Sequence, residues 1–208
     1  MEVMTDIEVY SDGDGNRVFQ LSAVAFDLDG RINSPHELLQ NEDCFFDAVT
    51  STYPFPVEPQ TIEWWAREEQ RAAAANLRAL VAKDDQRPPV LLENFSRFLI
   101  STLGRRGGHW ANPPTFDLKI VRDLYAYVGV VPAWSYKQQR DMRTIMELAR
   151  RLASAKRPSI DETGLVKHNG LHDAVSQAVL VQSAYKALGL HAGNYQRIKG
   201  KDLSGEAV

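Results

Sequence analysis

The chain has 208 residues, of which 44% are hydrophobic and 25% charged, and this balance excludes disordered and fibrous proteins. A formal net charge of −3 argues against a surface coated with basic residues for duplex binding. Cys44 is the single cysteine, which excludes an intramolecular disulfide and fits a reducing compartment. We expect one domain over residues 1–192 and a polar, mobile tail over residues 193–208.

The sequence also predicts where the protein resides. No apolar run approaches the roughly 20 residues that a membrane span needs. The first residues, MEVMTDIEVY, are acidic where a signal peptide is basic. We therefore expect a cytoplasmic protein that does not bind a membrane.

The first half of the chain predicts strands followed by helices. In chain order the strands cover residues 7–10, 18–26 and 44–49, and the helices cover residues 61–81 and 90–103. The turn formers SDGDGN between the first two strands predict a hairpin loop. Thr61 is the expected N-cap of the first helix, whose Ala-rich sequence runs to Val81 on one apolar face.

The second half alternates in the same way. It predicts a short buried strand at residues 108–112 and helices over residues 115–128, 138–153 and 171–189. The first of these helices should begin near Thr115 or Phe116, after two prolines. A loop over residues 156–170 precedes the last helix. Strands that alternate with helices in this order indicate an α/β protein.

The stretch VAFDLDG at residues 24–30 suggests one possible chemistry. An apolar strand followed by Asp-x-Asp-Gly begins the phosphatases of the haloacid dehalogenase kind, in which Asp27 would attack phosphorus and Asp29 would act as acid and base. Arg31 follows where such an enzyme needs a hydroxyl side chain, and an earlier strand carries better-placed acids. We therefore interpret Asp27 and Asp29 as a turn with a positive φ at Gly30, and keep the phosphatase as an alternative.

Three other motifs place acidic residues at the ends of predicted elements. Asp6 and Glu8 lie two apart on the first strand and so project from one face, although a solvated edge strand would explain them equally well. HWANPPTFD brings Asp117 to the start of a helix, where the helix dipole alone could account for it. HNGLHDA, the most specific motif, puts His168 in a loop and Asp173 in the first turn of the last helix.

Taken together, these motifs resemble the DEDDh 3′–5′ exonucleases of the ribonuclease H-like superfamily. The segments EWW, HWANPPTFDLKIVRDLY and RDMRT are similar to the branch that contains mycobacterial ribonuclease AS and phage exonuclease A. The resemblance runs from about Val3 to Leu188. It implies an α/β fold with a mixed β-sheet, antiparallel in its first three strands and parallel afterwards, flanked by helices.

The resemblance also implies a mechanism. The four carboxylates of Asp6, Glu8, Asp117 and Asp173 would hold two divalent cations, Mg²⁺ or Mn²⁺, because their oxygens are hard ligands. His168 would be the general base that activates water. The implied activity is two-metal-ion hydrolysis that removes nucleoside 5′-monophosphates from single-stranded RNA or DNA 3′ ends.

Substrate contacts away from the metals are predicted from single residues. The family has Thr where this chain has Val9, so the ring of the adjacent Tyr10 is expected to stack on the terminal nucleotide instead. Trp64 and Trp65 point about 100° apart on one helix; we assign Trp65 as a base platform, the alternative being that both pack in the core. The other candidate substrate contacts are Asn112, Arg143 and Lys167.

Two further expectations concern function and assembly. A catalytically silent nucleic-acid-binding protein on the same fold remains a second alternative to the exonuclease. The resemblance also makes a twofold homodimer the expected assembly.

Overall fold

The computed structural model describes residues 1–190 apart from residues 12–16, 29–30, 105–106 and 155–159. The tip of the predicted hairpin loop, the aspartate and glycine that end the DLDG turn, and the polar tail therefore lie outside the described residues. Within the described part, no helix is long and apolar enough to cross a membrane.

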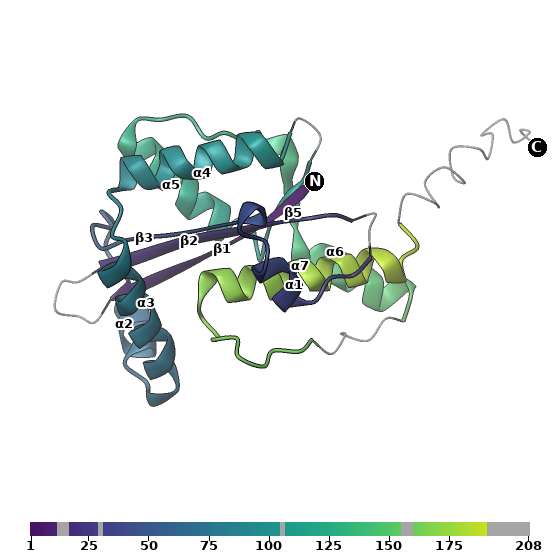
Figure 1. The fold of residues 1–208 in the computed structure, drawn as a ribbon, viewed down its shortest axis with the longest axis horizontal. Coiled ribbons are helices and arrows are strands. Elements are labelled where there is room, and N and C mark those ends of the chain that lie inside the picture. Colours follow the sequence, from purple (N-terminus) through teal and green to yellow (C-terminus); the bar gives the residue numbers. More distant parts are fainter. Residues whose placement is uncertain (12–16, 29–30, 105–106, 155–159, 191–208) are drawn as a thin grey trace, which may run out of the picture.

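A mixed β-sheet of five strands forms the centre of the described molecule (Figure 1). Its spatial order is β3-β2-β1-β4-β5. The first three strands pair antiparallel, and β4 and β5 continue the sheet parallel to β1. This arrangement confirms the predicted α/β fold with a ribonuclease H-like sheet. The strands are β1 (Glu2–Ser11), β2 (Arg17–Phe26), β3 (Phe45–Thr50), β4 (His109–Ala111) and β5 (Gln139–Asp141).

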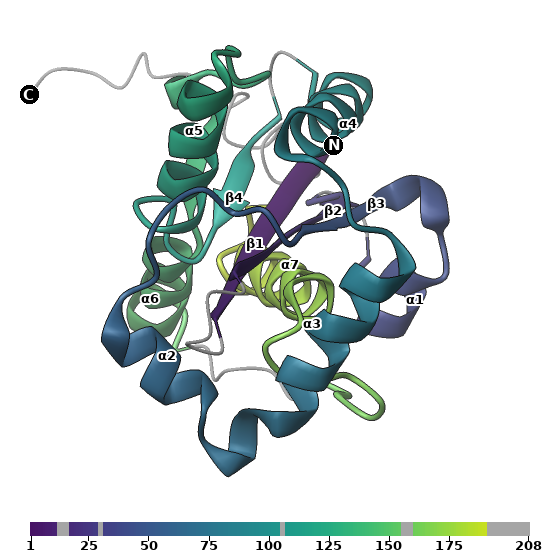
Figure 2. The same cartoon turned by 90° about the vertical axis from the view of Figure 1, so that its left-hand side faces the viewer.

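Helices cover both faces of this sheet (Figure 2). On one face α4 (Pro88–Thr102) and α5 (Asp117–Val128) pack over alternate residues of β1 such as Val3 and Ile7. On the other face α6 (Met142–Leu152), α7 (Gly170–Ala187) and the short α1 (Pro35–Leu39) cover the intervening residues, among them Met4. Because side chains alternate along a strand, Asp6 and Glu8 lie on the α7 face.

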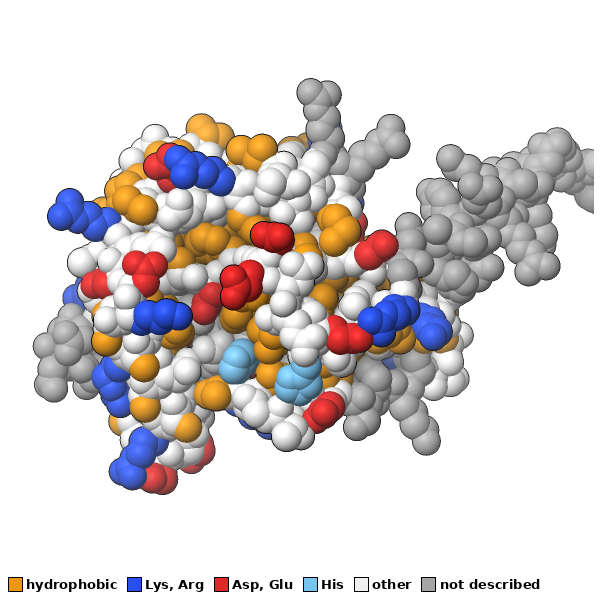
Figure 3. Space-filling view, viewed as in Figure 1, with side chains coloured by type: hydrophobic (Ala, Val, Ile, Leu, Met, Phe, Trp, Pro, Cys, Tyr) orange, Lys and Arg blue, Asp and Glu red, His pale blue; other side chains and the backbone are white. Residues whose placement is uncertain are grey.

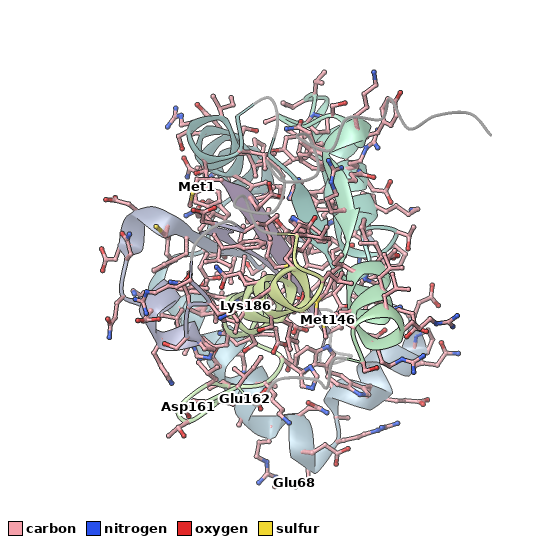
Figure 4. All side chains as sticks on the ribbon, turned by 90° about the vertical axis from the view of Figure 1, so that its right-hand side faces the viewer. Met1, Glu68, Met146, Asp161, Glu162 and Lys186 are labelled. Atoms are coloured by element: carbon pink, nitrogen blue, oxygen red, sulfur yellow. The ribbon has the colours of Figure 1, made fainter. Side chains whose placement is uncertain are left out.

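A helical hairpin extends past the carboxyl end of β1. It consists of α2 (Pro59–Trp65), a 3₁₀ turn (Glu68–Gln70) and α3 (Arg71–Lys83). Glu68 marks its outer tip in Figure 4, and Figure 3 shows basic side chains over this part of the molecule. Two further 3₁₀ turns cover Glu42–Cys44 and Tyr136–Gln138.

The prediction of one continuous helix over residues 61–81 was wrong. The helix ends at Trp65, and its N-cap is Glu58 with Pro59 in the first turn, so Thr61 lies inside the helix. The Trp65 indole Nε1 donates to the Val9 carbonyl at 2.8 Å, which anchors α2 beside β1, while α3 packs against β2 and β3. A straight helix could not make both contacts, so the chain turns between them.

The prediction of a helix start at residue 138 was also wrong. Residues Gln139–Asp141 form β5, the edge strand next to β4. Helix α6 begins only after Asp141, whose carboxylate caps it by accepting from the Arg143 amide at 2.9 Å. The polar sequence QRD gave no hydrophobic signal for a strand.

Asp27 lies away from the carboxyl ends of the parallel strands. It follows β2 at the end where Phe26 pairs with Glu2, so it lies beside the amino end of β1. Its side chain is exposed, and its backbone carbonyl accepts a hydrogen bond from Gln182. Ligand sites in open α/β sheets lie outside the carboxyl ends of the strands, so this placement does not support a phosphatase nucleophile.

Candidate active site

The site forms where β4 stops short beside β1. Strand β4 pairs with β1 only at Val3 and Met4. Beyond this point β1 continues through Asp6 and Glu8, and their side chains project toward the amino end of α7. Asp6 is buried and its Oδ1 accepts a hydrogen bond from the Gln177 amide of α7 at 2.7 Å.

Two helix starts bring the other two carboxylates to the same place. Asp117 is the first residue of α5 and is 3% exposed, and its Oδ2 accepts from the backbone N–H of Asn112 at 3.1 Å. Asp173 lies in the first turn of α7. Its Oδ2 accepts from the backbone amide of His168 at 3.0 Å, which ties the preceding loop to the helix.

The side chains of these residues meet in one cluster. Ligand atoms of Glu8, His168 and Asp173 lie within 4.8 Å of one another. Asp6 belongs to the same cluster, because after burial the charges of Glu8, Asp117 and Asp173 raise its pKa well above its ordinary value. The structure therefore brings together the five residues that the sequence singled out from three distant segments.

The carboxylates resist ionisation in the absence of a cation. Burial, followed by the charges of Asp173 and Asp117, raises the pKa of Glu8 to about 8. Burial raises the pKa values of Asp117 and Asp173 to about 6 in both cases, against hydrogen bonds from the backbone that lower them. Buried carboxylates that face one another are stabilised as anions by a divalent cation, and carboxylate oxygens are ligands that Mg²⁺ and Mn²⁺ prefer. The donor set thus fits such ions.

His168 occupies an unusual backbone conformation beside an aromatic ring. Its φ of 59° is in the left-handed region, which residues other than glycine adopt infrequently. Its imidazole packs edge-on against the Trp64 ring, with centroids 4.7 Å apart. Burial and the adjacent Lys167 charge lower the pKa of His168, so the imidazole is mostly neutral near pH 7.

An apolar groove of about 460 Å³ opens beside Glu8. Its walls include Tyr53 and Val57, Trp64 from α2, and Phe116 and Ile120 from the start of α5. Phe116 is 54% exposed. Flat rings beside a carboxylate cluster provide surfaces on which nucleobases stack.

Two of the aromatic residues predicted to contact the substrate are largely covered in the structure. Tyr10 is 4% exposed: its ring packs against Trp65, with centroids 5.3 Å apart, and its hydroxyl is bonded to Arg78. Trp65 is 5% exposed and its indole N–H is bonded to Val9. The Tyr10 ring is covered, so its assignment was wrong. Trp65 also lines the groove, but so little of it is exposed that its role as a base platform stays a prediction. Trp64, which the sequence could not distinguish from its neighbour, is the tryptophan beside His168.

The polar candidates Asn112, Arg143 and Lys167 lie at the border of the carboxylate cluster. The Arg143 guanidinium donates to the Asn112 side-chain oxygen at 3.1 Å. Burial raises the pKa of Asp117, and the Arg143 charge partly opposes this rise. Lys167 is exposed next to His168. Sequence reasoning missed Gln177, whose Nε2 holds Asp6 and whose buried Oε1 has no hydrogen-bond partner in the described part of the chain; an amide in an apolar helix carries no motif.

Comparison with known proteins agrees with this geometry. Residues 1–185 match the family described as the Rv2179c-like 3′–5′ exoribonuclease domain. Among curated proteins none matches the chain significantly. The match spans the whole sheet and nearly all of α7, including every residue of the cluster. The chain therefore belongs to the Rv2179c-like 3′–5′ exoribonuclease family, whose members are described as enzymes that hydrolyse phosphodiester bonds from a 3′ end.

Proposed function

We propose that the protein is a metal-dependent 3′–5′ exonuclease that removes nucleoside 5′-monophosphates from the ends of single-stranded RNA. The observation that carries this proposal is the cluster of four carboxylates with His168 at the mouth of an apolar groove. The family description adds the direction of attack and favours RNA over DNA.

Each residue of the cluster has a role in the proposal. Asp6, Glu8, Asp117 and Asp173 would hold two Mg²⁺ or Mn²⁺ ions. When bound, such ions polarise the scissile phosphate and stabilise the leaving 3′ oxygen. Gln177 holds the Asp6 carboxylate in place through its hydrogen bond of 2.7 Å.

His168 would be the general base. Because burial and Lys167 lower its pKa, the neutral imidazole is available at neutral pH to take a proton from the attacking water. The hydrogen bond from its backbone amide to Asp173 fixes the loop that carries it. A base close to the metal ligands is positioned to act on water at the phosphate.

The groove supports a single strand as the substrate. Trp64 and Phe116 line the groove and would stack on unstacked bases, which a duplex keeps stacked in its interior. Arg143 and Lys167 lie at the border of the cluster and would contact phosphate oxygens. A protein without net positive charge that binds only the end of one strand needs few basic side chains of this kind.

A digest of 5′-labelled oligonucleotides tests the proposal. RNA and DNA of the same sequence are incubated with Mn²⁺ or with EDTA, and we expect a ladder of shortened RNA in Mn²⁺ alone. Asp117→Ala should remove the ladder. Asp123→Ala is the matched control, because Asp123 lies on the same helix, is exposed and pairs with Lys119. A ladder that survives Asp117→Ala or EDTA would contradict the metal-dependent mechanism, and RNA binding without shortening would indicate a silent binder.

A further inference from the structure

A row of buried and half-buried polar side chains crosses the sheet beneath the amino end of α7. Gln20 and Ser22 lie on β2, opposite Glu8 and Asp6 of β1. Asp47 lies on β3, opposite Ser22. Because paired residues share a face of the sheet, all five side chains project toward α7. Three of them, Gln20, Ser22 and Asp47, have no part in the proposed chemistry.

The Gln20 amide has a single orientation that satisfies its partners. Its Nε2 donates to Asp47 Oδ1 at 2.7 Å, and its Oε1 accepts from the Gly170 amide at 2.9 Å. The Ser22 hydroxyl also donates to Asp47 Oδ1, at 2.7 Å. The Gly170 backbone N–H can only donate, so it fixes the amide oxygen of Gln20 on its own side. The Gln20 Nε2 must then face Asp47, which accepts from it.

Gly170 is the first residue of α7 and lies two residues after His168. A Cβ at this residue would come within 2.8 Å of Ser22 Oγ and 3.4 Å of the Asp6 carbonyl, so the helix start rests directly on β1 and β2. Three neighbouring contacts fix the same turn. Asn169 caps the helix and bonds Asn76 of α3, and the Val166 amide donates to His172 Nδ1.

These contacts surround His168, whose backbone is in the left-handed conformation. A φ of 59° at His168 costs free energy unless the surrounding structure holds it. The side chain of His168 has no hydrogen bond that fixes the imidazole in the described part of the chain, only the edge-on contact with Trp64. The position of the imidazole therefore depends on where the backbone of residues 166–170 is held.

We propose that Gln20 is a positioning residue for His168, acting through the Gly170 amide while Asp47 accepts a hydrogen bond from its Nε2. This inference rests on the proposed function, because it assigns His168 the role of general base. Gln20 is fully buried and contacts neither the groove nor any carboxylate of the cluster through a hydrogen bond. Its effect on the reaction must therefore pass through the backbone that presents His168.

A double-mutant cycle tests the coupling. Gln20→Met keeps the length of the side chain but removes both hydrogen bonds. We expect it to lower kcat about 30-fold with KM changed less than 3-fold, since small displacements of a catalytic group cost up to about 100-fold. In the His168→Ala background the same change should lower kcat less than 3-fold. An equal loss in both backgrounds would overturn the proposal.

Gln182→Met is the matched control. Gln182 is also a buried glutamine, its amide bonds Asn33 and Asp27, and it lies nine residues beyond Asp173 on the same helix. We expect this variant to lose thermal stability with kcat within 2-fold of the parent. If Gln182→Met lowers kcat as much as Gln20→Met does, Gln20 acts only through stability and the proposal fails.

Amide hydrogen exchange gives a readout independent of activity. In Gln20→Met the amides of residues 166–170 should exchange at least about 10-fold faster, while those of α4 stay unchanged. Unchanged exchange at residues 166–170 would overturn the proposal. If Gln20→Met does not fold, Asp47→Ala replaces it: this variant removes the acceptor that holds the Gln20 Nε2 and should produce the same effects at smaller size. A parent protein that fails to shorten RNA in Mn²⁺ refutes the proposed function, whereas the exchange experiment still reports on the Gln20 contact.

Discussion

Glu8→Gln should stabilise the metal-free protein while it abolishes activity. The substitution keeps the shape of the side chain and removes a carboxyl group that burial and the charges of Asp173 and Asp117 disfavour as an anion. The same carboxylate that would bind a cation is thus a cost to the fold when no cation is present. Functional sites often carry such a cost.

The size of this effect follows from the pKa of Glu8, which is raised from 4.5 to about 8 in the folded protein. Above pH 4.5 the unfolded chain loses this proton while the folded protein keeps it, so stability falls as the pH rises toward 8. At about 1.4 kcal/mol for each tenfold change, the cost is about 1 kcal/mol at pH 5 and about 4 kcal/mol at pH 7.5. The stabilisation by Glu8→Gln should therefore be about 3 kcal/mol larger at pH 7.5 than at pH 5.

Thermal unfolding in EDTA at the two pH values measures this difference. For a chain of this length, 3 kcal/mol corresponds to a Tm increase of roughly 6 to 12 °C. Glu63→Gln, a change at an exposed residue of α2, is the control and should alter Tm little at either pH. With Mn²⁺ the parent should gain stability and the variant should gain less, because one ligand is missing.

Two results would refute the reasoning. An increase in Tm of the same size at pH 5 and pH 7.5 would mean that ionisation of Glu8 is not the source of the cost. A variant less stable than the parent at pH 7.5 in EDTA would mean that the carboxylate is stabilised in the fold without a cation.

Three further predictions concern single side chains. Trp64→Ala should lower kcat/KM for RNA at least about 10-fold, whereas Trp65→Phe should keep activity and lose about 1 kcal/mol of stability through its lost hydrogen bond, by denaturant unfolding. Lys167→Met should raise the pKa of His168 and so move the acid limb of the kcat/KM profile to higher pH; an unmoved limb would contradict the assignment. Burial lowers the pKa of His109 from 6.5 to about 3, so its neutral form is favoured in the fold and stability is lost as the pH falls below 6.5. His109→Gln should remove about 2 kcal/mol of the loss between pH 7 and pH 5, and an unchanged pH dependence of unfolding would argue against this role.

The sequence predicts the elements with strong apolar patterns and misses those without one. VFQLSAVAF in β2 predicts its strand because its residues are β-formers bounded by turns. β5 has the polar sequence QRD, and it is a strand only because β4 offers a partner. The break after Trp65 is hidden because good helix formers continue on both sides, and tertiary contacts decide where the helix turns.

The residues of the candidate site likewise divide into those that the sequence predicts and those that it misses. The acidic residues and His168 were identified because their spacing repeats a family pattern and because the ends of elements converge. Tyr10 was misassigned and Trp65 is largely covered, since strand parity and helical angle do not reveal which ring packs in the α2–α3 hairpin. Gln20 and Gln177 were missed because their roles arise from the register between strands and from packing of α7, which only the folded chain shows.

Because β4 is short, the second half of β1 has no neighbouring strand on the β4 side, although β1 lies in the middle of the sheet. Beyond Thr5, the backbone of β1 is paired with β2 on one side only. On the other side the Ile7 amide donates to the Asp117 carboxylate and the Trp65 indole donates to the Val9 carbonyl. Main-chain groups along this free side can be presented to a ligand whatever side chains the strand carries, so Val9 in place of the family's threonine need not weaken recognition. A longer β4 would pair with these groups and exclude the substrate. The early end of β4 therefore leaves the remaining main-chain groups of β1 without a strand partner beside the carboxylate cluster.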